Sequence, residues 1–145
     1  MLWTRIRLKQ QDVYVGCLYR PPDEKVKFWS VLDDSLEGLE EEVVLMGDLN
    51  VDVLSSSDTN IVHLKATCTP LQLKNLVHAP TRLSSTSQKC LDVILSNSTS
   101  LNPAVVEHLD FSDHALVYSK IEQHLPTYEP RTFIVRRLTD DTGPF

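Results

Sequence analysis

The sequence contains little cysteine and no long apolar run. Its three cysteines, Cys17, Cys68 and Cys90, are far apart and form no CxxC pair. This pattern excludes a zinc site built on paired cysteines and favours a reducing compartment. No apolar stretch approaches the ~18 residues of a membrane-spanning helix, and the N-terminal segment lacks the apolar centre of a signal peptide. We therefore expect an intracellular protein, nuclear or cytoplasmic and not secreted, without a membrane partner.

The chain also lacks an excess of positive charge. It has 14 Lys and Arg against 20 Asp and Glu, which gives a net charge of −6. Such a balance is not typical of proteins that bind the nucleic-acid backbone through a large net positive charge. It does not exclude an enzyme that acts on nucleic acid, because a carboxylate pocket for a metal ion itself adds negative charge. Overall charge is therefore no evidence for a DNA substrate.

Length and composition indicate one soluble globular domain. The 145 residues are 41% hydrophobic and 23% charged, values that are ordinary for a folded domain of this size. The regular apolar pattern fades after Leu125, where Pro126 and Pro130 interrupt it. We expect the domain to occupy residues 1–124, with residues 125–145 forming a linker or tail towards a downstream region.

The pattern of apolar residues predicts a mixture of strands and helices. Alternation or continuous apolar character indicates strands, and apolar residues at helical spacing after Asp23 indicate a helix. Strands are expected over 3–9, 12–19, 43–47, 75–82, 90–97 and 115–122, with a weaker one over 104–108. A second helical stretch is expected over 61–76, interrupted at Pro70, and a turn over 84–89. This mixture favours a layered α/β architecture.

Polar residues stand where several of these strands begin or end. Asp48 and Asn50 follow one buried strand in "MGDLNVD", Tyr19 ends another, and "SDH" opens the last. A GDxN sequence alone is commonly an Asx turn, and "SDH" alone is compatible with a turn before a strand. Asp92 lies within an apolar strand, where an unpaired carboxylate costs several kcal/mol. His114 is the obvious partner, because a carboxylate bonded to one imidazole nitrogen fixes the tautomer.

An ordered set of motifs resembles a known superfamily. The segments are "YRPP", "VVLMGDLN", "APTRLSS", "CLDVILSN" and "FSDHALV". Together they resemble the endonuclease/exonuclease/phosphatase superfamily, whose fold is that of deoxyribonuclease I. More narrowly, residues 3–121 look like the apurinic-type endonuclease domain of non-LTR (LINE-type) retrotransposons. The resemblance implies the C-terminal part of a four-layer α/β sandwich, with two packed, mainly antiparallel sheets flanked by helices.

The resemblance also assigns catalytic roles in a metal-assisted hydrolysis of phosphodiester bonds. Asp48 would orient and deprotonate the attacking water, and Asn50 would position that water and the phosphate. His114 would donate to a non-bridging phosphate oxygen, where negative charge grows in the transition state, and Asp92 would orient His114. Tyr19 would offer its phenol to the phosphate.

Metal and substrate residues follow from the same resemblance. Asp113 would help to hold Mg²⁺, with Mn²⁺ as an alternative, because a hard cation prefers carboxylate oxygen and water. Thr81 and Ser112 match positions at which the family has hydroxyls near the scissile phosphate. Arg82 and Arg20 are candidates for contacts with the DNA backbone. The implied partners are DNA and, in a longer polyprotein, a reverse transcriptase region.

The family's domain begins with a front portion that carries an Asn and a metal-binding Glu, and neither is found in this sequence. We therefore expect an N-terminally truncated domain. Three functions remain open. The first is a DNA-nicking endonuclease that starts target-primed reverse transcription, and the second is a catalytically inactive remnant. The third is a phosphomonoesterase that acts on a substrate such as an inositol phosphate; the "APTR" and "LDVILSN" motifs favour the retrotransposon branch over it.

Overall fold

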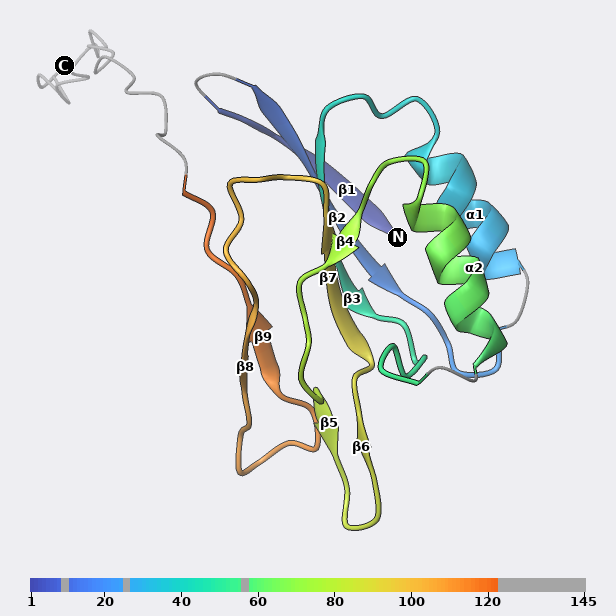
Figure 1. Ribbon diagram of the computed structural model, residues 1–145, viewed down its shortest axis with the longest axis vertical. Helices are drawn as coiled ribbons and strands as arrows, with labels where there is room; N and C mark the ends of the chain where they lie inside the picture. The colour runs from blue at the N-terminus through green and yellow to red at the C-terminus, as the bar shows by residue number, and fades with distance from the viewer. Residues whose placement is uncertain (9–10, 25–26, 56–57, 123–145) are drawn as a thin grey trace, which may run out of the picture.

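A five-stranded mixed sheet forms the centre of the computed structural model, which describes residues 1–8, 11–24, 27–55 and 58–122 (Figure 1). The strands follow the order β1-β2-β3-β7-β4. Their bounds are β1 Leu2–Arg7, β2 Asp12–Tyr19, β3 Glu42–Asp48, β7 Asp92–Ser96 and β4 Lys74–Asn75. Only β2 and β3 pair in parallel, whereas the other three pairs are antiparallel. The expected tail over residues 125–145 lies outside the described residues.

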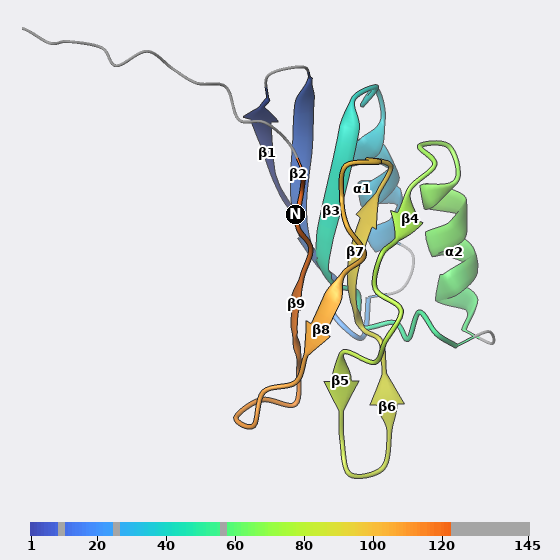
Figure 2. The same cartoon turned by 60° about the vertical axis from the view of Figure 1, so that its left-hand side comes forward.

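Two helices cover one face of this sheet (Figure 2). Helix α1, Lys27–Leu36, makes the crossover between the parallel strands β2 and β3, which a short turn could not span. It buries Trp29, Leu32 and Leu36. Helix α2, Thr59–Cys68, is capped at its N-terminus by Asp58, whose side chain accepts a hydrogen bond from the Asn60 amide. Both helices pack against inward-facing sheet residues such as Leu45 and Leu95 in one apolar cluster.

The opposite face carries a small second sheet. Strands β8, Val105–Glu107, and β9, Leu116–Tyr118, form an antiparallel pair. Val106 and Val117 pack against a second cluster that contains Val13, Val44 and Ile94. A hairpin made of β5, Arg82–Leu83, and β6, Gln88–Lys89, extends beyond the central sheet at the end where β3 stops (Figure 2). The described chain thus has a helical layer, a main sheet and a smaller sheet, as the sequence predicted for an α/β sandwich.

Several predicted elements differ in extent from the structure, and the strand expected over 115–122 is confined to β9, Leu116–Tyr118. The second helix ends at Cys68 instead of continuing towards Leu76, because Pro70 cannot extend it and Gln72 takes a left-handed conformation with φ of 55°. The strand expected over 75–82 is reduced to its two ends, which belong to β4 and β5. The turn expected over 84–89 is the tip of the β5–β6 hairpin and includes β6.

No helix among the described residues is long and apolar enough to cross a membrane.

The three thiols differ sharply in accessibility. Cys17 is exposed, whereas Cys68 and Cys90 are buried. Burial raises the pKa of both buried thiols to about 11, because an apolar environment penalises the thiolate. We expect one of the three thiols to react rapidly with dithionitrobenzoate at pH 8 in the native protein, and all three in denaturant. Rapid reaction of more than one native thiol would contradict the described packing.

Candidate active site

Three of the predicted site residues lie in one row across the central sheet. Asp48 is the last residue of β3 and pairs with Tyr19 of β2 on one side. On the other side it pairs with Asp92, the first residue of β7. The row forms because the apolar cores of these strands fix their register, and a slip of one residue would turn every side chain to the wrong face. The strands therefore bring Asp48 and Asp92, 44 positions apart in the sequence, to directly opposed positions.

The loop after β3 orients the Asp48 carboxylate. One carboxylate oxygen accepts a hydrogen bond from the Asn50 backbone amide at 2.7 Å, and the other accepts from Asn50 Nδ2 at 3.3 Å. Asn50 has a φ of 49°, a left-handed conformation that asparagine adopts more readily than most residues. The Asx turn and the candidate site are therefore the same feature, since the turn holds the carboxylate at the mouth of the site.

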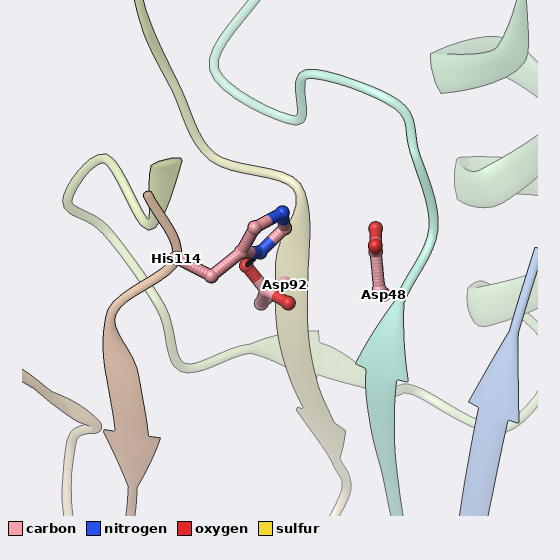
Figure 3. Close-up of side chains that lie close together, drawn as sticks. All are labelled: Asp48, Asp92 and His114. Carbon is pink, nitrogen blue, oxygen red and sulfur yellow. Dashed lines mark hydrogen bonds and ion pairs between the residues drawn. The ribbon is translucent and has the colours of Figure 1, made fainter. Parts of the chain in front are cut away.

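His114 completes the cluster from a distant part of the chain. Its Nδ1 lies 3.0 Å from Oδ2 of Asp92, and their side chains are 31% and 21% exposed (Figure 3). A bridge between Arg82 and His114, together with the bond from the Ala115 amide to the Thr81 carbonyl at 2.7 Å, ties this segment to the β5 strand. The contact that the sequence predicted between Asp92 and His114 is present. The second ring nitrogen of His114, Nε2, is directed away from Asp92.

The geometry of this cluster fits a divalent metal ion. Ligand atoms of Asp48, Asp92 and His114 all lie within 4.8 Å of one another, and all three residues are partly buried. Two carboxylates at directly opposed positions of neighbouring strands repel each other unless a cation lies near both. Carboxylate oxygens are also the ligands that hard divalent cations prefer. The donor set and the local charge therefore both favour a bound cation.

Asp113 and Arg82 are paired with each other beside this cluster. Nε of Arg82 donates to Oδ2 of Asp113 at 2.8 Å, in an exposed ion pair. This hydrogen bond lowers the pKa of the Asp113 carboxyl below its ordinary value. Asp113 does not belong to the group formed by Asp48, Asp92 and His114. Its assignment as a metal ligand stays a prediction, as does the DNA contact of Arg82.

The remaining predicted residues divide into exposed and buried ones. Tyr19 is 61% exposed and open to a ligand. The Ser112 hydroxyl accepts a hydrogen bond from the His114 amide at 3.0 Å. Thr81 is fully buried, and its hydroxyl oxygen accepts from the amides of Leu91 and Asp92, both at 3.0 Å. From this position Thr81 holds the start of β7, and its role near the scissile phosphate stays a prediction.

Arg20 also differs from its predicted position. The sequence placed it on the surface as a candidate DNA contact, but the residue is only 3% exposed. Its guanidinium points inward and donates to the backbone carbonyls of Leu49 and Glu24. The sequence alone contains no signal for this, because an arginine at the end of a strand can turn to either face.

Comparisons with known proteins agree with this fold. A family model described as "Endonuclease-reverse transcriptase" matches residues 13–118. The structure is similar to the "Endonuclease domain of TRAS1, a telomere-specific non-LTR retrotransposon", with a TM-score of 0.69 and 21% identity over 83% of this chain and 60% of that one. It is also similar to an "endonuclease/exonuclease/phosphatase family protein from Leptotrichia buccalis C-1013-b", with a TM-score of 0.58 and 20% identity. That match covers 81% of this chain and 52% of the other.

These likenesses confirm the expected fold class. No curated protein sequence matches the chain significantly. The chain spans 60% and 52% of the lengths of the two solved structures. At such low identities the structural matches establish the fold alone, and the family rests on the match to residues 13–118.

Proposed function

Because this chain belongs to the endonuclease–reverse transcriptase family, we propose that it hydrolyses phosphodiester bonds of DNA with the help of Mg²⁺. The observation that carries the proposal is the convergence of Asp48, Asp92 and His114, whose ligand atoms lie within 4.8 Å of one another. Mn²⁺ has the same preference for carboxylate oxygen and is an alternative ion. When bound, the ion would polarise the phosphate and stabilise charge in the transition state.

Asp48 acts as the base towards the attacking water. Its carboxylate is held by two hydrogen bonds from Asn50 and keeps lone pairs that can accept a proton from water. Nδ2 of Asn50 donates to Asp48 and to the Arg20 carbonyl, so both amide hydrogens are used within the protein. Asn50 therefore positions the water through its Oδ1, as an acceptor, and does not donate to the phosphate.

His114 donates a proton or a hydrogen bond to a phosphate oxygen. Asp92 accepts from Nδ1, which fixes the ring and directs Nε2 outwards. In this role both ring nitrogens carry a proton, so the cation would be held by the two carboxylates, and Nε2 donates towards the oxygen on which negative charge grows. Tyr19 adds its exposed phenol as a further phosphate contact. Ser112 and Arg82 would assist in substrate binding, and Asp113 would join the metal ligands by leaving Arg82.

The proposed biological context follows from the family. Its description names a reverse transcriptase beside the endonuclease. We infer that the chain works inside the cell, in the nucleus or cytoplasm, together with a reverse transcriptase region of the same polyprotein. The nick would then supply the start point for reverse transcription at the target.

The substrate class is tested with supercoiled plasmid DNA. We expect the purified chain to convert supercoiled plasmid to nicked circles in Mg²⁺ and to stop when EDTA is added. A phosphomonoesterase would instead release inorganic phosphate from inositol phosphates and leave the plasmid intact. A folded chain that does neither would support the inactive-remnant alternative and contradict the proposal.

A further inference from the structure

Arg20 contacts three consecutive residues at the point where β3 ends and the next loop begins. Its backbone amide donates to the Asp48 carbonyl at 2.9 Å, and its own carbonyl accepts from Asn50 Nδ2 at 2.9 Å. Its side chain reaches the residue between them, since Nη1 donates to the Leu49 carbonyl at 3.3 Å. One residue at the end of β2 thus holds the whole Asp48–Leu49–Asn50 turn.

The other side of the guanidinium is fixed to the helical layer. Nη2 donates to the Glu24 carbonyl and lies 3.5 Å from Oδ1 of Asn60, which also accepts from the Trp29 indole at 3.3 Å. The centre of the guanidinium lies 6.0 Å from the Trp29 ring. These contacts join the loop to α1 and to the first turn of α2. The loop therefore has a rigid support, although it lies outside regular secondary structure.

The chemistry of this position is unusual for a purely structural residue. Burying a cation is costly unless it is paired, yet within residues 1–8, 11–24, 27–55 and 58–122 no carboxylate forms an ion pair with Arg20. Its Nε is buried without a hydrogen-bond partner in the same set of residues. A methionine of similar length would fill the volume without this cost. What it cannot supply is a fork of donors that reaches Leu49 and Asn60 at once.

We propose that Arg20 is a positioning residue that holds the Asp48–Asn50 turn in the geometry needed for attack on the phosphate. The catalytic consequence rests on the proposed function, whereas the support of the turn rests on the contacts alone. The residue acts through Asp48 and Asn50 and does not touch substrate. Arg20→Met is therefore expected to lower kcat about tenfold or more and to leave KM within about twofold, because a loosened support shell costs 10–100-fold in activity.

The salt dependence of DNA binding separates this role from a phosphate contact. If Arg20 bound the DNA backbone, Arg20→Met would reduce the slope of log K against log salt by about one and would raise KM. If Arg20 only supports the turn, Arg20→Met leaves the slope of log K against log salt unchanged. Arg5→Met serves as the matched control, because Arg5 is an exposed arginine on the edge strand β1 and lies outside the site. Its kcat should equal that of the unaltered chain.

Hydrogen exchange gives a readout that does not depend on activity. In Arg20→Met the amides of Leu49 and Asn50 should exchange about tenfold faster or more, while amides in the interior of β3 keep their protection. Arg20→Lys keeps the charge but not the forked set of donors, so it should show the same loss of protection. It is used if the methionine variant does not fold.

Wild-type exchange at the turn or wild-type kcat in a folded variant would overturn the inference. So would failure of both variants to fold, because Arg20 would then support the whole domain and not this turn. If the unaltered chain does not nick DNA, the proposed function fails, and the exchange result still decides whether Arg20 supports the turn.

Discussion

Replacing His114 with alanine is expected to lower the rate of DNA nicking by about 10²–10⁴-fold, the range that a positioned proton donor contributes. The side chain is partly exposed and makes its one side-chain hydrogen bond, among the described residues, to Asp92. Its removal should therefore leave the fold intact. The measurement is the initial rate of nicking of supercoiled plasmid in Mg²⁺, with the circular dichroism spectrum as the check on folding.

A double-mutant cycle tests whether Asp92 works through His114. Asp92→Asn keeps the shape of the side chain but disturbs the hydrogen bond to Nδ1 of His114. It should lower the nicking rate by about 10–100-fold. In the His114→Ala background the same change should lower the nicking rate little further, because the effects of residues that act as a unit are not additive. Additive losses would show that Asp92 does not act through His114 and that it contributes through the cation-binding group alone. Ser30→Ala serves as a control, because Ser30 is an exposed residue on α1, and this change should leave the nicking rate unaltered.

Gly47→Ala is expected to destabilise the protein severely. Gly47 precedes Asp48 and has a φ of 143°, a conformation that residues with a side chain rarely adopt. A Cβ at this position would lie 1.9 Å from the backbone oxygen of Leu18 on the neighbouring strand, and backbone cannot move aside as a flexible side chain can. We expect a loss of about 4 kcal/mol or more in the free energy of unfolding, measured by urea denaturation.

Gly38 provides the matched control for this substitution. It also has a positive φ, 77°, but a Cβ there would meet nothing within 4 Å. Gly38→Ala should therefore lower the free energy of unfolding by only about 1–2 kcal/mol, which is the cost of a left-handed backbone conformation for a residue with a side chain. Equal effects at the two glycines would contradict the close approach of β2 and β3 at the end of the strands.

Sequence reasoning succeeded where a local pattern and a physical need coincided. The strand over 12–19 was predicted with the bounds of β2, because its apolar run is stopped by Pro21 and Pro22. The contact between Asp92 and His114 followed from the cost of leaving a carboxylate unpaired in an apolar strand. The register that places Asp48 opposite Asp92 was not predicted, since pairing depends on contacts across the whole sheet.

The sequence does not determine the direction of side chains that can turn to either of two faces. Arg20 finds its partners 29 and 40 positions along the chain, at Leu49 and Asn60, and no local pattern encodes such contacts. Asp113 and His114 are adjacent where a strand begins, and neighbouring residues of an extended chain project to opposite sides. Only one of them faces Asp92, and the structure shows that it is His114, while Asp113 turns to Arg82.

The most direct measurement of the central claim compares nicking of supercoiled DNA by the unaltered chain and by Asp48→Asn at the same Mg²⁺ concentration. Asparagine keeps the size of the side chain but removes the charge that would draw a proton and a cation. If Asp48, Asp92 and His114 form one reaction centre, the rate of the variant should fall by about 100-fold or more. Equal rates in two folded preparations would contradict the account, because the nicking would then come from elsewhere.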